Sequence, residues 1–206
     1  MHGLHNPPIV VLSILIAMAA SHVALDLAGR TTAARGRAQA AWLGGGALSM
    51  GVGIWSMHYV AMLAFVLPIE VQYDLVTVLL SLLAAVFASG VALFAVSRPR
   101  LDAARLTIGA VVMGAGIASM HYVGMAAMRL PAVITWNRGI VALSIAIAVA
   151  VSWVALWLAF RLRHETRDVA PLKIASAAIM GLAVAAMHYT AMAAARFDPS
   201  DIAADM

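Results

Sequence analysis

One tripeptide, Met-His-Tyr, occurs three times in this chain of 206 residues, and each copy continues to a methionine four residues after the histidine. Imidazole and thioether groups together suit copper, and soft sulfur favours Cu(I) in particular. A spacing of four residues places the histidine and that methionine on one face of a helix. The sequence therefore predicts a metal site made of His58, His121, His188, Met57, Met120, Met187, Met62, Met125 and Met192.

Other chemistry fits these residues less well. Zinc accepts three imidazoles but leaves the methionines without a role, and magnesium or calcium would need carboxylates beside the histidines. Haem ligation is a further alternative, although no series of carboxylates for proton transfer accompanies it. The histidines could instead only form hydrogen bonds between helices, with the methionines filling gaps. Tyr59, Tyr122 and Tyr189 either hold the imidazoles in one tautomer, as outer partners of a metal site, or simply pack between helices.

Long apolar segments must position these motifs. Of all residues 64% are hydrophobic, only 11% are charged, and the mean hydropathy is +0.97, whereas soluble domains carry about 25% charged residues. Crossing the hydrocarbon core of a bilayer takes about 20 helical residues. Six segments are long enough, and too long for barrel strands: 8–28, 40–66, 75–97, 105–128, 139–160 and 172–195. The predicted fold class is an all-α integral membrane protein with six transmembrane helices in a lipid bilayer.

The six segments are three copies of one helical hairpin. The first segment of each copy has two serines eight residues apart, the second has a Met-Gly dipeptide seven residues before Met-His-Tyr, and a proline follows. These positions are Ser13/Ser21, Ser81/Ser89 and Ser144/Ser152, then Met50-Gly51, Met113-Gly114 and Met180-Gly181, then Pro68, Pro131 and Pro199. The repeats cover approximately 8–68, 75–131 and 139–199 and enter the membrane in the same sense, as parallel repeats. We expect residues 1–206 to form a single membrane domain, without a soluble output domain.

The basic residues predict how the chain is oriented. Ten of the thirteen lie in or beside the connections within hairpins: Arg30, Arg35, Arg37, Arg98, Arg100, Arg105, Arg161, Arg163, Arg167 and Lys173. Cytoplasmic loops are rich in Lys and Arg, so both termini should face the non-cytoplasmic side, and the net charge of +4 does not indicate nucleic-acid binding. The three histidines would then lie at one depth, about 10–15 Å below the outer boundary. We expect no cleaved signal peptide, and a chain without cysteine has no disulfide or thiolate ligand.

These motifs resemble the MHYT domain family of bacterial integral membrane sensors. The resemblance covers essentially the whole chain and rests on ALDLAGR (24–30), GIWSMHYVAM (53–62), GIASMHYVGM (116–125) and AVAAMHYTAM (183–192). It implies a domain of the bacterial plasma (inner) membrane that binds copper near its outer face and senses O2, CO or NO. The residues that match the family's proposed ligands are His58, His121 and His188, with Met57, Met120 and Met187.

Two features depart from the family. The first and second motifs end in valine where the family has threonine, which removes a hydroxyl but no copper ligand. Family members often continue into a cytoplasmic signalling domain, such as a cyclic-di-GMP synthase, a phosphodiesterase or a histidine kinase. This chain stops soon after its sixth apolar segment, so we expect no enzymatic activity of its own and a signal passed to a cytoplasmic or membrane partner.

The predicted function is thus a copper-binding membrane sensor, in which a diatomic gas or a redox change alters helix packing. The alternative is a copper carrier or small transporter without a signalling role, in which Met50, Met57, Met62 and their equivalents form a stepped path. A membrane oxidase or haem protein and a purely structural protein are the remaining interpretations.

Overall fold

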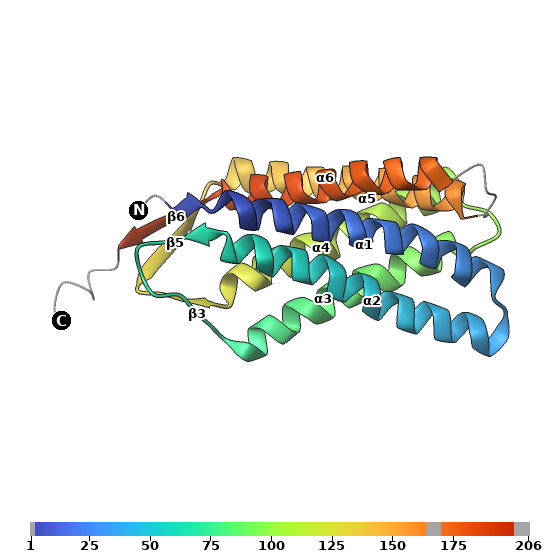
Figure 1. Ribbon diagram of the computed structural model, residues 1–206, viewed down its shortest axis with the longest axis horizontal. Helices are drawn as coiled ribbons and strands as arrows, with labels where there is room; N and C mark the ends of the chain where they lie inside the picture. Colours follow the sequence, from blue (N-terminus) through green and yellow to red (C-terminus); the bar gives the residue numbers. More distant parts are fainter. Residues whose placement is uncertain (1–2, 164–169, 200–206) are drawn as a thin grey trace.

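The computed structural model describes residues 3–163 and 170–199, which form a bundle of six long helices (Figure 1). The helices are α1 (Pro7–Ala33), α2 (Gly36–Leu63), α3 (Leu75–Val96), α4 (Ala103–Ala126), α5 (Arg138–Leu162) and α6 (Ala170–Met192). All six are long and apolar enough to cross a membrane, which confirms the predicted fold class. The largest difference in boundaries is at α1, which continues to Ala33 because its last, more polar turn remains helical beyond the apolar segment.

Three short antiparallel ribbons, which the sequence does not predict, lie together at one end of the bundle, called here the strand end (Figure 1). Strand β1 (Leu4–His5) pairs with β2 (Phe65–Val66), β3 (Gln72–Tyr73) with β4 (Met128–Arg129), and β5 (Ala132–Trp136) with β6 (Ala195–Pro199). In each pair the first strand precedes an odd-numbered helix and the second follows the next even-numbered helix. Each helical hairpin is therefore closed at the strand end by its own ribbon.

One polar residue begins each odd-numbered helix and also joins it to its hairpin partner. Asn6, Asp74 and Asn137 accept hydrogen bonds from backbone N–H groups of the first turn, which would otherwise lack partners. Their own backbone N–H groups donate, over 2.8–2.9 Å, to carbonyl oxygens one or two residues after the ends of the even-numbered helices. Those acceptors are Ala64, Ala127 and Ala194.

Asp74 should make the ribbon of β3 and β4 sensitive to acid. Its carboxylate accepts hydrogen bonds from the Thr77 hydroxyl and backbone N–H, at 2.6 and 3.0 Å, and pairs with Arg129 at 3.4 Å. These contacts, the Thr77 hydroxyl foremost, lower the pKa of Asp74 from its ordinary value of 3.8. A carboxyl with a lowered pKa in the folded state contributes stability that is present above the unfolded pKa and lost as the pH falls through the folded pKa.

We therefore expect amide protection in β3 and β4 to fall below about pH 4 in the wild-type protein, measured by hydrogen exchange. In Asp74→Asn, most of this pH dependence should be absent. The same acid sensitivity in both proteins would show that Asp74 is not the responsible group.

The three hairpins form a closed ring through close helix contacts. The glycine of each Met-Gly dipeptide faces the odd-numbered helix of the next repeat, and a Cβ atom there would lie 2.6–2.7 Å from a Cα atom of that helix. The pairs are Gly51 with Val86 in α3, Gly114 with Val149 in α5, and Gly181 with Met18 in α1. Lipid provides no hydrophobic drive for helix association, so such close approach supplies the packing energy of a membrane bundle.

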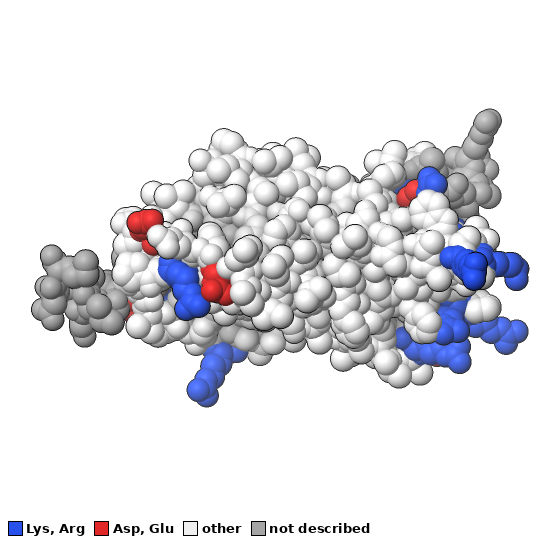
Figure 2. Space-filling view, turned by 90° about the horizontal axis from the view of Figure 1, so that it is seen from below, with Lys and Arg blue, Asp and Glu red and all other residues white. Residues whose placement is uncertain are grey.

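Charged side chains are segregated along the bundle. On the face shown in Figure 2, most Lys and Arg residues gather at the end opposite the strands, and the middle carries no charge. This end, where α1, α3 and α5 finish, is called the basic end. Arg163 is buried there and donates hydrogen bonds to the carbonyl oxygens of Val96 and Arg98 at 2.7 and 2.6 Å. Arg167, one of the basic residues used above to predict orientation, lies outside the described residues.

Candidate metal centre

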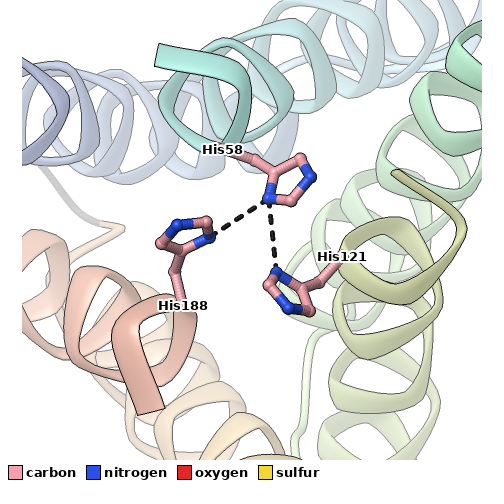
Figure 3. A group of neighbouring side chains, drawn as sticks. All are labelled: His58, His121 and His188. Carbon is pink, nitrogen blue, oxygen red and sulfur yellow. Dashed lines mark hydrogen bonds between the residues drawn. The ribbon is translucent and has the colours of Figure 1, made fainter. Parts of the chain in front are cut away.

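Three histidines meet inside the bundle, each from a different even-numbered helix (Figure 3). His58 lies in α2, His121 in α4 and His188 in α6, and each is at most 1% exposed. The Nδ1 atom of His58 lies 3.1 Å from Nδ1 of His188 and 3.3 Å from Nδ1 of His121. One ring nitrogen from each residue lies within 4.8 Å of the others. The structure thus brings together the three imidazoles that the sequence placed at one depth.

This spacing fits one metal ion. Three nitrogens about 2.0 Å from a common ion are ~3.3–3.5 Å apart in tetrahedral or trigonal geometry, close to the observed 3.1 and 3.3 Å. Hydrogen bonding alone satisfies the arrangement poorly, because a neutral imidazole donates through only one nitrogen. The three Nε2 atoms are also buried and have no hydrogen-bond partner among the described residues. The triad can therefore hold a metal ion.

A layer of methionine lies on the strand side of the triad. Met62, Met125 and Met192, each one turn after its histidine, are at most 5% exposed and share one cluster with Leu67 and Phe197. These three predicted methionines therefore lie in one cluster, one helical turn beyond the histidines.

The other three predicted methionines do not share a cluster. Met57 packs with Ala17 and Ala61, and Met187 lies in the main core of the bundle. Met120 is 1% exposed and belongs to neither group. The geometry thus favours the layer on the strand side as the source of sulfur over the methionines adjacent to the histidines in sequence.

The motif tyrosines hold the helices together around the triad. Their hydroxyls form hydrogen bonds with the first serine of the next repeat's pair: Tyr59 with Ser81 (3.5 Å), Tyr122 with Ser144 (2.6 Å) and Tyr189 with Ser13 (2.9 Å). Each tyrosine ring meets the adjacent imidazole edge-on, with centroids 4.9–5.1 Å apart. The contact with histidine is therefore packing, while the polar contact is with serine. The sequence marks these serines as repeat positions, but their role as partners of the tyrosines could not be seen from the spacing.

Gly124 leaves room for the His58 ring. It occupies the position that alanine has in the other two motifs, and a Cβ atom there would overlap with Nε2 of His58. Because only the end of a side chain stands in the way, Gly124→Ala should displace the His58 imidazole without unfolding the protein. We expect the affinity for Cu(I) to fall about ten-fold, as when a ligating histidine loses its orientation.

Competition with a coloured Cu(I) chelator measures this change. Gly44→Ala in α2, where an added Cβ meets nothing within 4 Å, is the control and should bind like wild type. Unchanged affinity in Gly124→Ala would argue against His58 as a ligand.

A bundle of six membrane-crossing helices in three repeats, each supplying one histidine to a buried triad, defines a polytopic membrane protein with a central candidate metal site. The chain belongs to the MHYT family, whose model is described as a bacterial signalling protein N terminal repeat and matches residues 1–41, 51–109, 114–171 and 181–206. The last three matches begin at the glycines of the Met-Gly dipeptides. The predicted resemblance is confirmed.

Curated relatives place the family in signalling. The chain is 51% identical to the bifunctional diguanylate cyclase/cyclic di-GMP phosphodiesterase MucR of Pseudomonas aeruginosa, over 94% of this chain and 28% of that protein. It is 40% identical to the signaling protein YkoW of Bacillus subtilis (95% and 25%) and 39% identical to the cyclic di-GMP phosphodiesterase NbdA of P. aeruginosa (92% and 24%). The chain spans about a quarter of the length of these relatives. No solved structure matches it.

Proposed function

We propose that this membrane signalling domain is a copper-dependent sensor. His58, His121 and His188 would hold the ion through Nδ1, with sulfur supplied by the layer of Met62, Met125 and Met192. The observation that carries this proposal is the convergence of three buried imidazole nitrogens within 4.8 Å. Copper is favoured over zinc because thioethers select soft Cu(I), and methionine surrounds the triad on the strand side.

Bound copper would supply a position for O2, CO or NO and an exchangeable electron. Gas binding or a change in oxidation state would displace the imidazoles, and neighbouring side chains would pass that displacement on to other helices. Each histidine is followed by a tyrosine whose hydroxyl contacts the next hairpin, and each even-numbered helix touches that hairpin through a glycine. A small displacement of an imidazole would therefore reach the odd-numbered helices α1, α3 and α5 through contacts with little free space.

The signal would act on cyclic di-GMP metabolism, since two of the relatives carry that activity in their names. We propose that residues 1–206 act as one non-catalytic sensing unit for a signalling enzyme, which is either attached or a separate cytoplasmic or membrane partner. In this arrangement the basic end faces the cytoplasm of a bacterial inner membrane, and the strand end, with both chain termini, faces the other side.

Two measurements separate this sensor from a copper carrier. With Cu(I)-loaded protein in lipid nanodiscs, CO should produce an infrared band that shifts with ¹³CO and is absent when all three histidines are replaced by alanine. Vesicles containing the protein should accumulate copper no faster than empty vesicles. Copper uptake that depends on the three histidines, without a CO response, would favour the carrier instead.

A further inference from the structure

A narrow cavity of about 60 Å³ lies inside the bundle between the triad and the basic end. Residues from all six helices line it, which places it on the axis of the bundle. Along α1 its lining extends from Ala17 to Ala28, about 16 Å at 1.5 Å per residue. Met57, the neighbour of His58, lines the end nearest the triad.

Three equivalent methionines line this cavity. Met50, Met113 and Met180 come from α2, α4 and α6, each seven residues before a Met-His-Tyr motif. They are 5–7% exposed and belong to one core cluster. Two helical turns separate them from the motif methionines, about 10 Å along the axis. The bundle thus has a second layer of three thioethers, distinct from the layer on the strand side.

One buried hydroxyl group without a partner among the described residues lies beside these sulfurs. Ser152 lines the cavity and is fully buried, yet its Oγ has no hydrogen-bond partner among the described residues. Ser21 lines the same cavity. The equivalent Ser89 in α3 is also buried with an unpartnered Oγ but is not part of the lining. The first serines of the three pairs, in contrast, all bond to tyrosine. A buried hydroxyl is costly unless something satisfies it, so this layer indicates a ligand with which oxygen can interact.

The lining also limits the charge of that ligand. Of the described residues that line the cavity, none carries a charge, so a bound ion would have no counter-charge beside it. The cost of burying an ion rises with the square of its charge, which disfavours divalent metals. Thioethers select soft ions such as Cu(I), and methionine is flexible enough to turn its sulfur onto an ion.

We propose that Met50, Met113 and Met180 form a second site, for a soft monovalent cation such as Cu(I), separate from the histidine triad. The second site lies on the bundle axis, between the histidine triad and the basic end. It shares no ligand with the triad. This inference does not depend on the proposed sensor function.

Silver(I) is the probe, because it has the charge and soft character of Cu(I) but does not change oxidation state under these conditions. The detergent-purified full chain is loaded with excess Ag(I) and desalted, and bound silver is counted per chain by mass spectrometry. Wild type should retain two equivalents. The triple variant Met50→Leu, Met113→Leu, Met180→Leu should retain one, with little loss of stability because leucine conserves the volume of methionine.

The matched control is the triple variant Met62→Leu, Met125→Leu, Met192→Leu, which alters the strand-side layer and should keep the equivalent bound at the axial site.

A second measurement does not need the axial variant to fold. In a chain with His58, His121 and His188 all replaced by alanine, X-ray absorption at the silver edge should show one ion surrounded mainly by sulfur.

Equal silver content in wild type and the axial variant would overturn the proposal, as would a histidine-free chain that binds no silver. So would a cavity that takes up xenon but not silver, since it would then hold neutral guests. The two hypotheses fail separately. If only the axial variant loses silver and the histidine-free chain keeps all of it, the histidine triad is not a metal site. If only the histidine-free chain loses silver, the axial site does not exist.

Discussion

Replacing His58 with alanine should weaken Cu(I) binding by about 100-fold, and by more than the same change at His121 or His188. Structural zinc sites with four ligands contribute about 10–16 kcal/mol, so one ligand accounts for roughly 3 kcal/mol, or a factor of about 100. His58 is the common member of both short contacts, 3.1 Å to His188 and 3.3 Å to His121. Its loss removes both of these contacts between Nδ1 atoms, whereas either other substitution removes only one.

Chelator competition gives the affinities, and thermal unfolding with and without Cu(I) provides the control for folding. Wild type should gain a higher Tm from Cu(I), and the His58 variant should gain less at the same Cu(I) concentration while still unfolding cooperatively. If all three single variants bind Cu(I) like wild type, the histidines serve only as hydrogen-bonding groups between helices.

Replacing Gly181 with alanine should lower the free energy of unfolding by about 1–3 kcal/mol, the usual cost of inserting a methyl group into a packed contact. The added Cβ would lie 2.6 Å from the Cα atom of Met18, and backbone of α1 cannot move aside as a side chain can. This contact joins the last hairpin to the first, so the substitution opens the ring where the chain itself provides no connection.

Gly44→Ala is the matched control, since it adds the same atom to a helix interior where nothing lies within 4 Å. It should be neutral or stabilising by about 0.5–1 kcal/mol, because alanine is the better helix former. Denaturant titration in detergent compares the two variants. Equal stabilities would mean that α1 and α6 are not packed as closely as the ring requires.

The six helices and their repeats could be predicted because their causes are local. A span needs about 20 apolar residues, and a duplicated hairpin leaves serine, Met-Gly and Met-His-Tyr at matching positions. The three histidines could also be placed at one level, since counting residues along a helix gives depth. Their contact could not be predicted in the same way, because it depends on how three hairpins pack.

The ribbons at the strand end escaped prediction for a physical reason. Four of the six strands contain only two residues, too few for a pattern, and their pairing follows from the helix ends that hold them together. Asn6, Asp74 and Asn137 were nevertheless visible signals, because each lies seven residues before a serine that pairs with a motif tyrosine. Which methionines converge was equally unpredictable, since sequence spacing allows both Met57 and Met62 to lie near His58.

The most direct test of the account is the metal content of the purified protein beside a variant with His58, His121 and His188 all changed to alanine. After reconstitution with Cu(I) and Zn(II) in competition under reducing conditions, X-ray absorption should show wild type with one copper ion in a shell that contains nitrogen. The folded triple variant should have lost that ion, whatever it retains at sulfur-only sites. Absence of nitrogen-bound metal from wild type, or its survival in the triple variant, would contradict a metal centre at the histidine triad.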